Sequence, residues 1–452
     1  MARPNILLLM ADQLAAPALP FYGHTVVRTP ALSALAARSL VFDAAYCNFP
    51  ICAPSRYSML TGRLPHAISA FDNACELASE IPTMAHYLGA AGYRTILAGK
   101  MHFVGPDQLH GFDERLTTDI YPSEFLWVPD WSQGPANKPT GVGMGHVVDA
   151  GPCLRNMQID YDEEVEHVAV QKLYDLARHG GGQPFFLTAS FTHPHPPFVA
   201  PQEHWDAYAD SEIDLPSVPE IPYEQLDPHS QWLYLAHGQD RHTITREHVL
   251  RARRAYYAMA SYVDEKIGRV LQALRRAGLE DDTLVVFCGD HGEMMGVRGM
   301  WFKQTFYEWS ARVPLLVAGL GVAAPGRRAE VCSLVDLLPT FLDVAACASR
   351  RWSRWMAVRW RHCCEASRRR MKGRPCPNIR RRASARPRAW CAAAATSTST
   401  RWACRRCCSI WRAIRRSCAI WRGSRRCGSS RPSCIDAHWP TGTRTMFTAA
   451  SC

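Results

Sequence analysis

The chain has 452 residues and a formal net charge of +11. The excess of positive charge lies in residues 345–452, where 25 arginines and one lysine face only Glu365 and Asp436. The first 344 residues are therefore acidic overall, which argues against nucleic acid as their partner. The length of the whole chain suits one large domain with a smaller one.

Apolar runs and helical periodicity alternate along the first 344 residues. Strands are expected at 5–10, 94–99, 184–191, 283–288 and 313–317, and helices at 30–39, 83–91 and 247–277. Continuous apolar runs such as 5–10 are typical of strands buried on both faces of a parallel sheet. We therefore expect an α/β fold with a mostly parallel sheet flanked by helices. The segment 106–180 has little periodicity and is interpreted as an insertion that shapes the substrate site.

Four of the five expected strands end in polar clusters, which are Asp12-Gln13, Lys100-Met101-His102, His193-Pro194-His195 and Asp290-His291-Gly292-Glu293. Ligand sites form at the carboxyl ends of parallel strands, so these clusters are expected to meet. Carboxylates and an imidazole from separate strands suit Ca²⁺, Mg²⁺ or Mn²⁺, and Lys100 and Lys303 can hold an anion. Each cluster by itself has a simpler explanation, because an Asp after a strand is often a helix cap.

The segment Cys52-Ala53-Pro54-Ser55-Arg56, with Leu60-Thr61-Gly62-Arg63 after it, resembles the signature of type I sulfatases, whose Cys is converted to formylglycine. The alternative is a structural cysteine. A hydrated aldehyde offers one hydroxyl as the nucleophile and keeps the second to expel sulfate. Pro54 and Ser55 favour a helix start, which places Cys52 where backbone N–H groups attract anions. The guanidinium of Arg56 can hold the diol or the sulfate.

The resemblance runs from about Pro4 to Leu342 and implies an alkaline-phosphatase/sulfatase-like fold. It implies that a divalent ion, Ca²⁺ in the first place, is held by Asp12, Cys52 as formylglycine, Asp290 and His291. It also implies groups that bind sulfate and protonate the leaving oxygen, and these are Lys100, His102, His195, Lys303 and the amide of Asn73. Gln13 stands where many members have a second Asp, and His193 is the structural alternative to His195.

The stretch Gly99-Lys100-Met101-His102-Phe103-Val104-Gly105-Pro106 is similar to choline sulfatases, as are Asp12-Gln13 and Trp301-Phe302-Lys303. This implies release of choline and sulfate from choline-O-sulfate. Trp127 is a candidate wall of a cation–π box for the quaternary ammonium, with simple packing as the alternative. A phosphonate monoester hydrolase or phosphodiesterase of the same superfamily, or an inactive remnant, are the other interpretations.

Residues 1–344 are predicted to form the catalytic domain and 345–452 an aberrant tail. Eight Trp and twelve Cys in the tail argue against a basic, nucleic-acid-binding arm, because disordered segments are poor in such residues. Codons for residues 409–422, shifted by one base, can encode Phe-Asp-Leu-Glu-Gly-Asp-Pro-Gln-Glu-Leu-Arg-Asp-Leu-Ala, which is similar to sulfatase endings. We interpret the tail as frame-shifted and disordered. The resemblance implies that C-terminal segments supply a subdomain and the contacts of a homo-oligomer, which this chain as written lacks.

The expected location is the cytoplasm. The first 344 residues contain only six scattered cysteines, which fits a reducing compartment. The apolar run 6–10 is shorter than a signal-peptide core and no segment has the length of a membrane span. The expected partners are a small sulfate ester and the formylglycine-generating maturation enzyme, with no nucleic acid and no membrane.

Overall fold

The structure is a computed structural model, and it describes residues 3–345 except 122, 124–140, 210, 321 and 323. The chain divides into two compact units, Met1–Pro375 and Cys376–Cys452, and all described residues belong to the first. Trp127 and residues 346–452 lie outside the described residues, so the cation–π box, the boundary at 344 and the frame-shifted tail stay predictions.

The first unit is built on an eight-stranded sheet with the strand order β10-β2-β9-β8-β1-β6-β3-β4, and a second sheet pairs β5 with β7. The strands are β1 (Asn5–Ala11), β2 (Leu40–Tyr46), β3 (Arg94–Gly99), β4 (Glu114–Arg115), β5 (Gly151–Cys153), β6 (Phe185–Phe191), β7 (Val199–Pro201), β8 (Thr283–Gly289), β9 (Leu315–Gly319) and β10 (Gly326–Ser333). All pairs in the main sheet are parallel except those of β9, which runs antiparallel to both β2 and β8.

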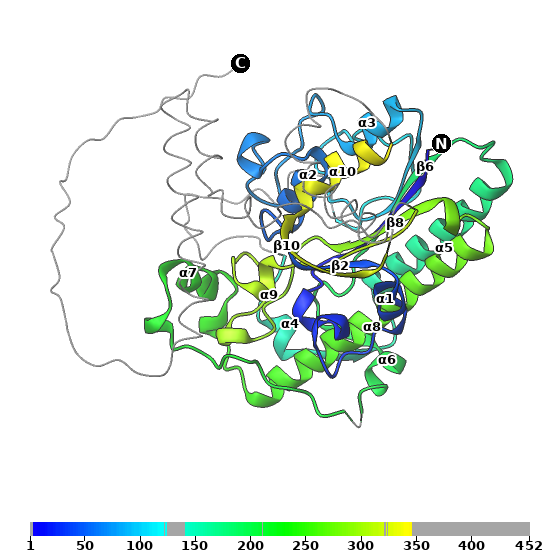
Figure 1. Ribbon diagram of the computed structural model, residues 1–452. Coiled ribbons are helices and arrows are strands. Elements are labelled where there is room, and N and C mark those ends of the chain that lie inside the picture. The colour runs from blue at the N-terminus through cyan, green and yellow to red at the C-terminus, as the bar shows by residue number, and fades with distance from the viewer. Residues whose placement is uncertain are drawn as a thin grey trace, which may run out of the picture. The chain divides into compact units, whose positions relative to one another are not determined.

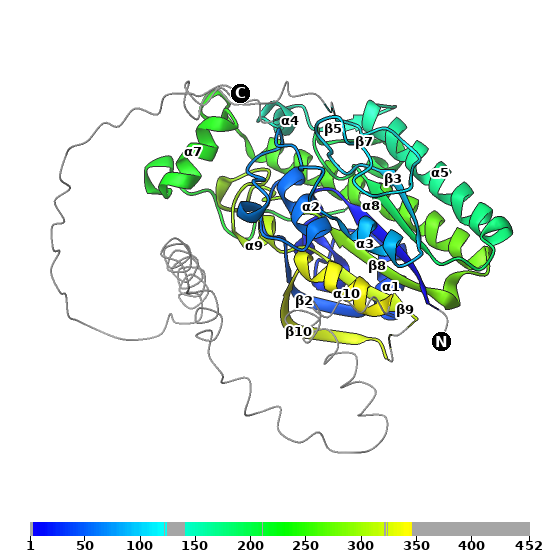
Figure 2. The same cartoon turned by 90° about the horizontal axis from the view of Figure 1, so that it is seen from above.

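Helices cover both faces of the main sheet. The helices of the described residues are α1 (Pro30–Ala37), α2 (Cys52–Thr61), α3 (Met84–Ala90), α4 (Gly145–Val148), α5 (Met157–His179), α6 (Gln202–Asp206), α7 (Pro228–Ala236), α8 (Arg246–Arg276), α9 (Glu308–Ala311) and α10 (Leu337–Val344). Figure 1 shows α2, α3 and α10 on one face and α1, α5 and α8 on the other, and Figure 2 shows the first group from above. The sheet is therefore the middle layer of three.

The central strand β1 divides the hydrophobic core in two. Leu7 and Leu9 belong to the cluster beneath α1, α5 and α8, whereas Ile6, Leu8 and Met10 belong to the cluster beneath α2, α3 and α10. Successive side chains of a strand point to opposite faces, so a strand between two helical layers buries side chains on both faces and is mostly apolar. This is why residues 6–10 form a continuous apolar run.

The structure confirms the expected α/β class with a mostly parallel sheet and all five expected strands. Two expectations need correction. The strand expected at 313–317 is β9, which begins at Leu315 and is antiparallel, because Val313 and Pro314 belong to the preceding connection. The segment 106–180, interpreted as an insertion with little periodicity, contains the 23-residue helix α5. The outer face of α5 is charged, and its inner face buries a stripe that includes Val165, Ala169 and Leu173. No helix in the described part of the chain has the length and apolarity needed to cross a membrane.

Candidate active site

The four neighbouring parallel strands β8, β1, β6 and β3 end at one edge of the sheet, where the predicted clusters meet. Their registers bring the ends level, because Ala11 pairs with Gly289 and with Phe191, and Gly99 pairs with Ser190. Gly99 has φ +98°, and a Cβ there would lie 2.0 Å from Ser190 O. Only glycine can therefore make this close approach, after which Lys100 turns into the site.

Cys52 is the first residue of α2 and is completely buried. The expected helix start is confirmed. The N-terminus of α2 is anchored from two sides, since Ala53 N donates to Asn73 Oδ1 at 3.0 Å and Ser55 Oγ donates to Asp290 O at 2.5 Å. These contacts place the Cys52 side chain among the groups that follow the four strands.

The four predicted metal ligands converge on one point. Ligand atoms of Asp12, Cys52, Asp290 and His291 all lie within 4.8 Å of one another, and all four residues are buried. His291 Nε2 lies 3.3 Å from Cys52 Sγ and 3.7 Å from carboxylate oxygens of both Asp12 and Asp290. Such spacings suit ligands around one ion with bonds of about 2.3–2.6 Å, and two carboxylates supply the oxygen donors that Ca²⁺ prefers. The donor set therefore fits a divalent cation.

Arg56 joins the two carboxylates of this set. Its Nε donates to Asp290 Oδ2 at 2.8 Å and its Nη2 to Asp12 Oδ2 at 3.2 Å. Its Nη1 donates to Lys100 O at 2.5 Å and to Ser190 Oγ at 2.9 Å. All three guanidinium nitrogens thus donate to protein acceptors, which gives Arg56 a role in positioning the two carboxylates. The predicted contact of Arg56 with the diol or sulfate stays a prediction.

Two ammonium groups face Cys52. Lys303 Nζ lies 3.1 Å and Lys100 Nζ 3.7 Å from Cys52 Sγ, and Lys100 is also ion-paired with Asp12. Burial would raise the pKa of the Cys52 thiol, but Lys100 and Lys303 hold it well below its ordinary value. The position of the sulfur is therefore one that stabilises negative charge, as an oxyanion nucleophile and a bound sulfate both require.

The two candidate histidines that follow β6 have different surroundings in the structure. His195 interacts with the Cys52 side chain, and burial together with Lys303 lowers the pKa of His195 to about 3. His193 instead lies 2.7 Å from Asp162 Oδ2 through its Nδ1. His102, in the loop after β3, also interacts with Cys52, and its Nε2 lies 3.1 Å from Asn73 O. The geometry places His102 and His195, but not His193, beside Cys52.

The sequence did not single out Tyr121 and Glu293. The Tyr121 hydroxyl lies 3.1 Å from His195 Nδ1, and its ring centroid lies 4.1 Å from Lys100 Nζ. Tyr121 belongs to the weakly periodic segment, where no local pattern marks it. Glu293 is completely buried, and burial raises its pKa although backbone amides and the Gln13 side chain donate to it. Its place one residue after Gly292 in the fourth cluster was the only signal.

Several residues at this edge have left-handed backbone conformations that are rare without glycine. They are Gln13 (φ 62°), His102 (φ 64°), Phe302 (φ 64°) and Gln304 (φ 74°). Such conformations cost about 1–3 kcal/mol each and persist where surrounding contacts impose them, often at functional sites. Lys303 lies between two of them, so its backbone position is strongly constrained.

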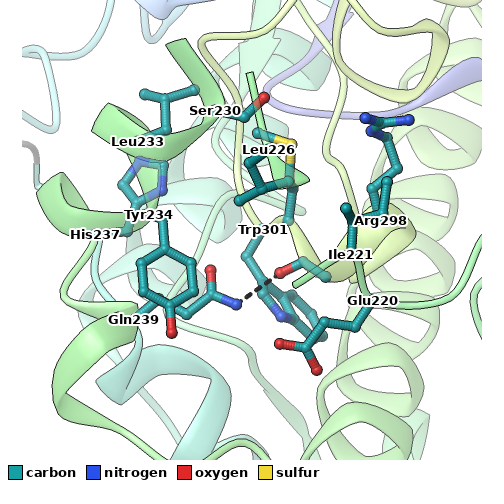
Figure 3. A pocket seen from close by; sticks show the side chains of 12 residues that line it. Glu220, Ile221, Leu226, Ser230, Leu233, Tyr234, His237, Gln239, Arg298 and Trp301 are labelled. Carbon is teal, nitrogen blue, oxygen red and sulfur yellow. Dashed lines mark hydrogen bonds between the residues drawn. The ribbon is translucent and has the colours of Figure 1, made fainter. Parts of the chain in front are cut away.

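A small pocket, lined by none of the predicted site residues, lies beside the loop that carries Lys303 (Figure 3). Residues of the 220–239 segment line it together with Arg298, Gly299, Met300 and Trp301. Gln239 Nε2 donates to Gly299 O at 2.8 Å, and His237 Nε2 lies 3.0 Å from Gln304 Oε1. The pocket lining thus ties the segment around α7 to both sides of the Lys303 loop.

Comparison with known proteins gives a consistent result. The sulfatase family profile matches residues 4–347. The choline-sulfatase of Rhizobium meliloti (strain 1021) is 47% identical over 357 residues, which cover 78% of this chain and 70% of that protein. The arylsulfatase of Clostridium perfringens is 30% identical and covers 76% of this chain and 75% of its own length. The crystal structure of a phosphonate monoester hydrolase of Agrobacterium radiobacter is 26% identical with a TM-score of 0.58, covering 76% of this chain and 74% of that one.

Proposed function

This chain belongs to the sulfatase family, and on that premise we propose that it hydrolyses choline-O-sulfate to choline and inorganic sulfate. The observation that carries the substrate is the 47% identity to a choline-sulfatase over most of the chain. The site supports the reaction class, because it brings a nucleophile position, two ammonium groups and a cation-binding carboxylate pair together.

The proposed roles follow from what each side chain contacts. Once Cys52 is matured and a divalent ion is held by Asp12, Asp290 and His291, they supply an activated hydroxyl at neutral pH. The chain itself supplies the electrostatic environment. Lys100 and Lys303 face this position and would bind the sulfate oxygens, whose negative charge their buried ammonium groups stabilise.

The leaving oxygen of an alkyl sulfate needs a proton. His195 Nδ1 donates to Pro196 O at 2.6 Å, so the neutral ring has its free lone pair on Nε2. With its pKa lowered to about 3, His195 carries no second proton at pH 7. Lys303 is a charged donor only 3.1 Å from Cys52 Sγ, and we assign the protonation to it.

A second candidate function is hydrolysis of phosphonate monoesters or phosphodiesters. The phosphonate monoester hydrolases of Agrobacterium radiobacter and Silicibacter pomeroyi are both 26% identical to this chain, with TM-scores of 0.58 and 0.57. The lower identity makes this the alternative. The third candidate is an inactive remnant, in which residues 1–344 fold but catalyse no reaction. The experiment below distinguishes all three.

The test is sulfate release from choline-O-sulfate by the chain co-expressed with a formylglycine-generating enzyme. A phosphonate monoester and a phosphodiester are assayed in parallel, and mass spectrometry establishes conversion of Cys52. Cys52→Ala is the matched control, because it removes the nucleophile from a buried position without adding bulk. A preference for choline-O-sulfate supports the proposal, and a preference for a phosphorus ester overturns the substrate.

A version with the restored reading frame after residue 344 is compared in the same assay. Activity of the restored version alone would mean that the C-terminal part is needed for turnover. Failure of both versions, with formylglycine present at residue 52, would reject choline-O-sulfate as the substrate.

A further inference from the structure

We propose that Gln13 and Glu293 form a two-residue relay that fixes the ammonium group of Lys303 against the nucleophile, and that both act as positioning residues. The catalytic consequence of this relay rests on the proposed sulfate ester hydrolysis, whereas the relay itself is inferred from contacts among buried side chains. Gln13, Glu293 and Lys303 are exposed by 0%, 0% and 1% of their surface.

The relay starts at Glu293. Its Oε1 accepts hydrogen bonds from Met295 N at 3.1 Å and from Phe302 N at 2.6 Å, while its Oε2 accepts from Gln13 Nε2. Both oxygens of Glu293 are therefore acceptors in these contacts, and all three partner groups are N–H donors.

The relay ends at Lys303. Its Nζ donates to Gln13 Oε1 at 2.7 Å and lies 3.1 Å from Cys52 Sγ. Glu293 therefore constrains Lys303 at two places, through the backbone of the preceding Phe302 and through the amide that holds the ammonium. The left-handed backbone of Phe302 and Gln304 shows that the loop needs such contacts to keep its shape.

The chemistry of an amide explains why residue 13 is Gln. In these contacts Glu293 accepts every hydrogen bond and the ammonium of Lys303 donates, so the group between them must both donate and accept. An ionised Asp or Glu at position 13 has no donor for Glu293. The amide orientation is then set by Glu293, because a flipped amide would turn its NH₂ group toward the ammonium of Lys303.

The test exchanges the polarity of the pair. In Glu293→Gln the new amide keeps an oxygen for the two backbone amides but turns an NH₂ group toward the NH₂ group of Gln13. In Gln13→Glu two carboxylates face each other. In the double variant the amide at 293 donates to the carboxylate at 13, which still accepts from Lys303. Glu203→Gln, whose side chain is 81% exposed, is the matched control.

We expect each single variant to lose roughly tenfold to hundredfold in kcat/KM, the effect of a lost hydrogen bond to a charged group. The double variant should recover to within about threefold of the wild type. A general packing role would instead leave the double variant as poor as the worse single variant, and that result overturns the relay. Single variants within about twofold of the wild type, or losses reversed by raising the Ca²⁺ concentration, overturn it as well.

The wild type, the two single variants and the double variant are loaded with Ca²⁺ and titrated with inorganic sulfate, a measurement that involves no turnover. Weaker sulfate binding in both single variants and recovery in the double variant support the relay even if choline-O-sulfate is not a substrate. Kinetics are then measured with 4-nitrophenyl sulfate, so that a wrong substrate and a wrong relay give different results. Sulfate binding that is equal in all four proteins, or absent from the wild type, overturns the relay.

Discussion

Arg56→Met tests whether one guanidinium holds the metal-binding carboxylates in place. The methionine side chain keeps much of the apolar volume but removes the charge and the donors. Arg56 and its two acidic partners, Asp12 and Asp290, have fully buried side chains. Burial alone would raise the pKa of Asp12, but Lys100 and Arg56 among its neighbours hold it below the ordinary value. Without Arg56, Asp12 keeps Lys100, but Asp290 loses the cation bonded to it through Oδ2.

Removing one partner of a buried ion pair costs about 3–5 kcal/mol, because the other charge stays buried without compensation. A typical protein has a free energy of unfolding of about 5–15 kcal/mol, so this single substitution should remove a large part of it. The loss is measured by urea unfolding in EDTA. Added Ca²⁺ should stabilise Arg56→Met more than the wild type, because a divalent cation supplies the missing counter-charge.

Arg269→Met is the matched control. Arg269 also pairs with two acids, Glu166 and Glu265, but its side chain is 50% exposed. Exposed ion pairs contribute about 0–1 kcal/mol, so this variant should unfold close to the wild type. The reasoning is refuted if Arg56→Met loses less than about 1 kcal/mol, or no more than Arg269→Met.

Three further predictions concern the same site and its surroundings. Lys303→Ala should reduce turnover of choline-O-sulfate about 10²–10⁴-fold more than that of 4-nitrophenyl sulfate, whose leaving group needs no proton; equal losses would reject Lys303 as the acid. EDTA should lower the midpoint of thermal unfolding and abolish sulfate release, because Asp12 and Asp290 then lose a shared cation. If adding back Ca²⁺, Mg²⁺ or Mn²⁺ does not raise the midpoint above its value in EDTA, the metal site is contradicted. Burial lowers the pKa of His237 to about 4, from 6.5, so the unfolded chain gains this proton first as the pH falls. Stability should therefore drop by about 3 kcal/mol between pH 6.5 and 4, and urea midpoints of His237→Gln should show a smaller drop, whereas equal drops would refute the cause.

The sequence alone determined the fold class and indicated the family. Strands buried on both faces are mostly apolar along their whole length, so β1, β3, β6 and β8 were visible as runs without any tertiary information. Polar clusters at the ends of parallel strands meet at one edge, which predicted the convergence that the structure has. The Cys52 motif is a local pattern, and it indicated the family before the comparisons did.

Only the tertiary structure decided which groups contact one another. The motif marked Arg56, but not its ion-pair partners Asp12 and Asp290, which lie 44 and 234 positions away in the chain. His193 and His195 share one turn, and Asp162 from α5 separates their roles. The contacts of Gln13 with Glu293 and Lys303 span 280 and 290 positions. Local patterns record which side chains are apolar or polar, whereas hydrogen-bond partners depend on distances that exist only after the strands have assembled.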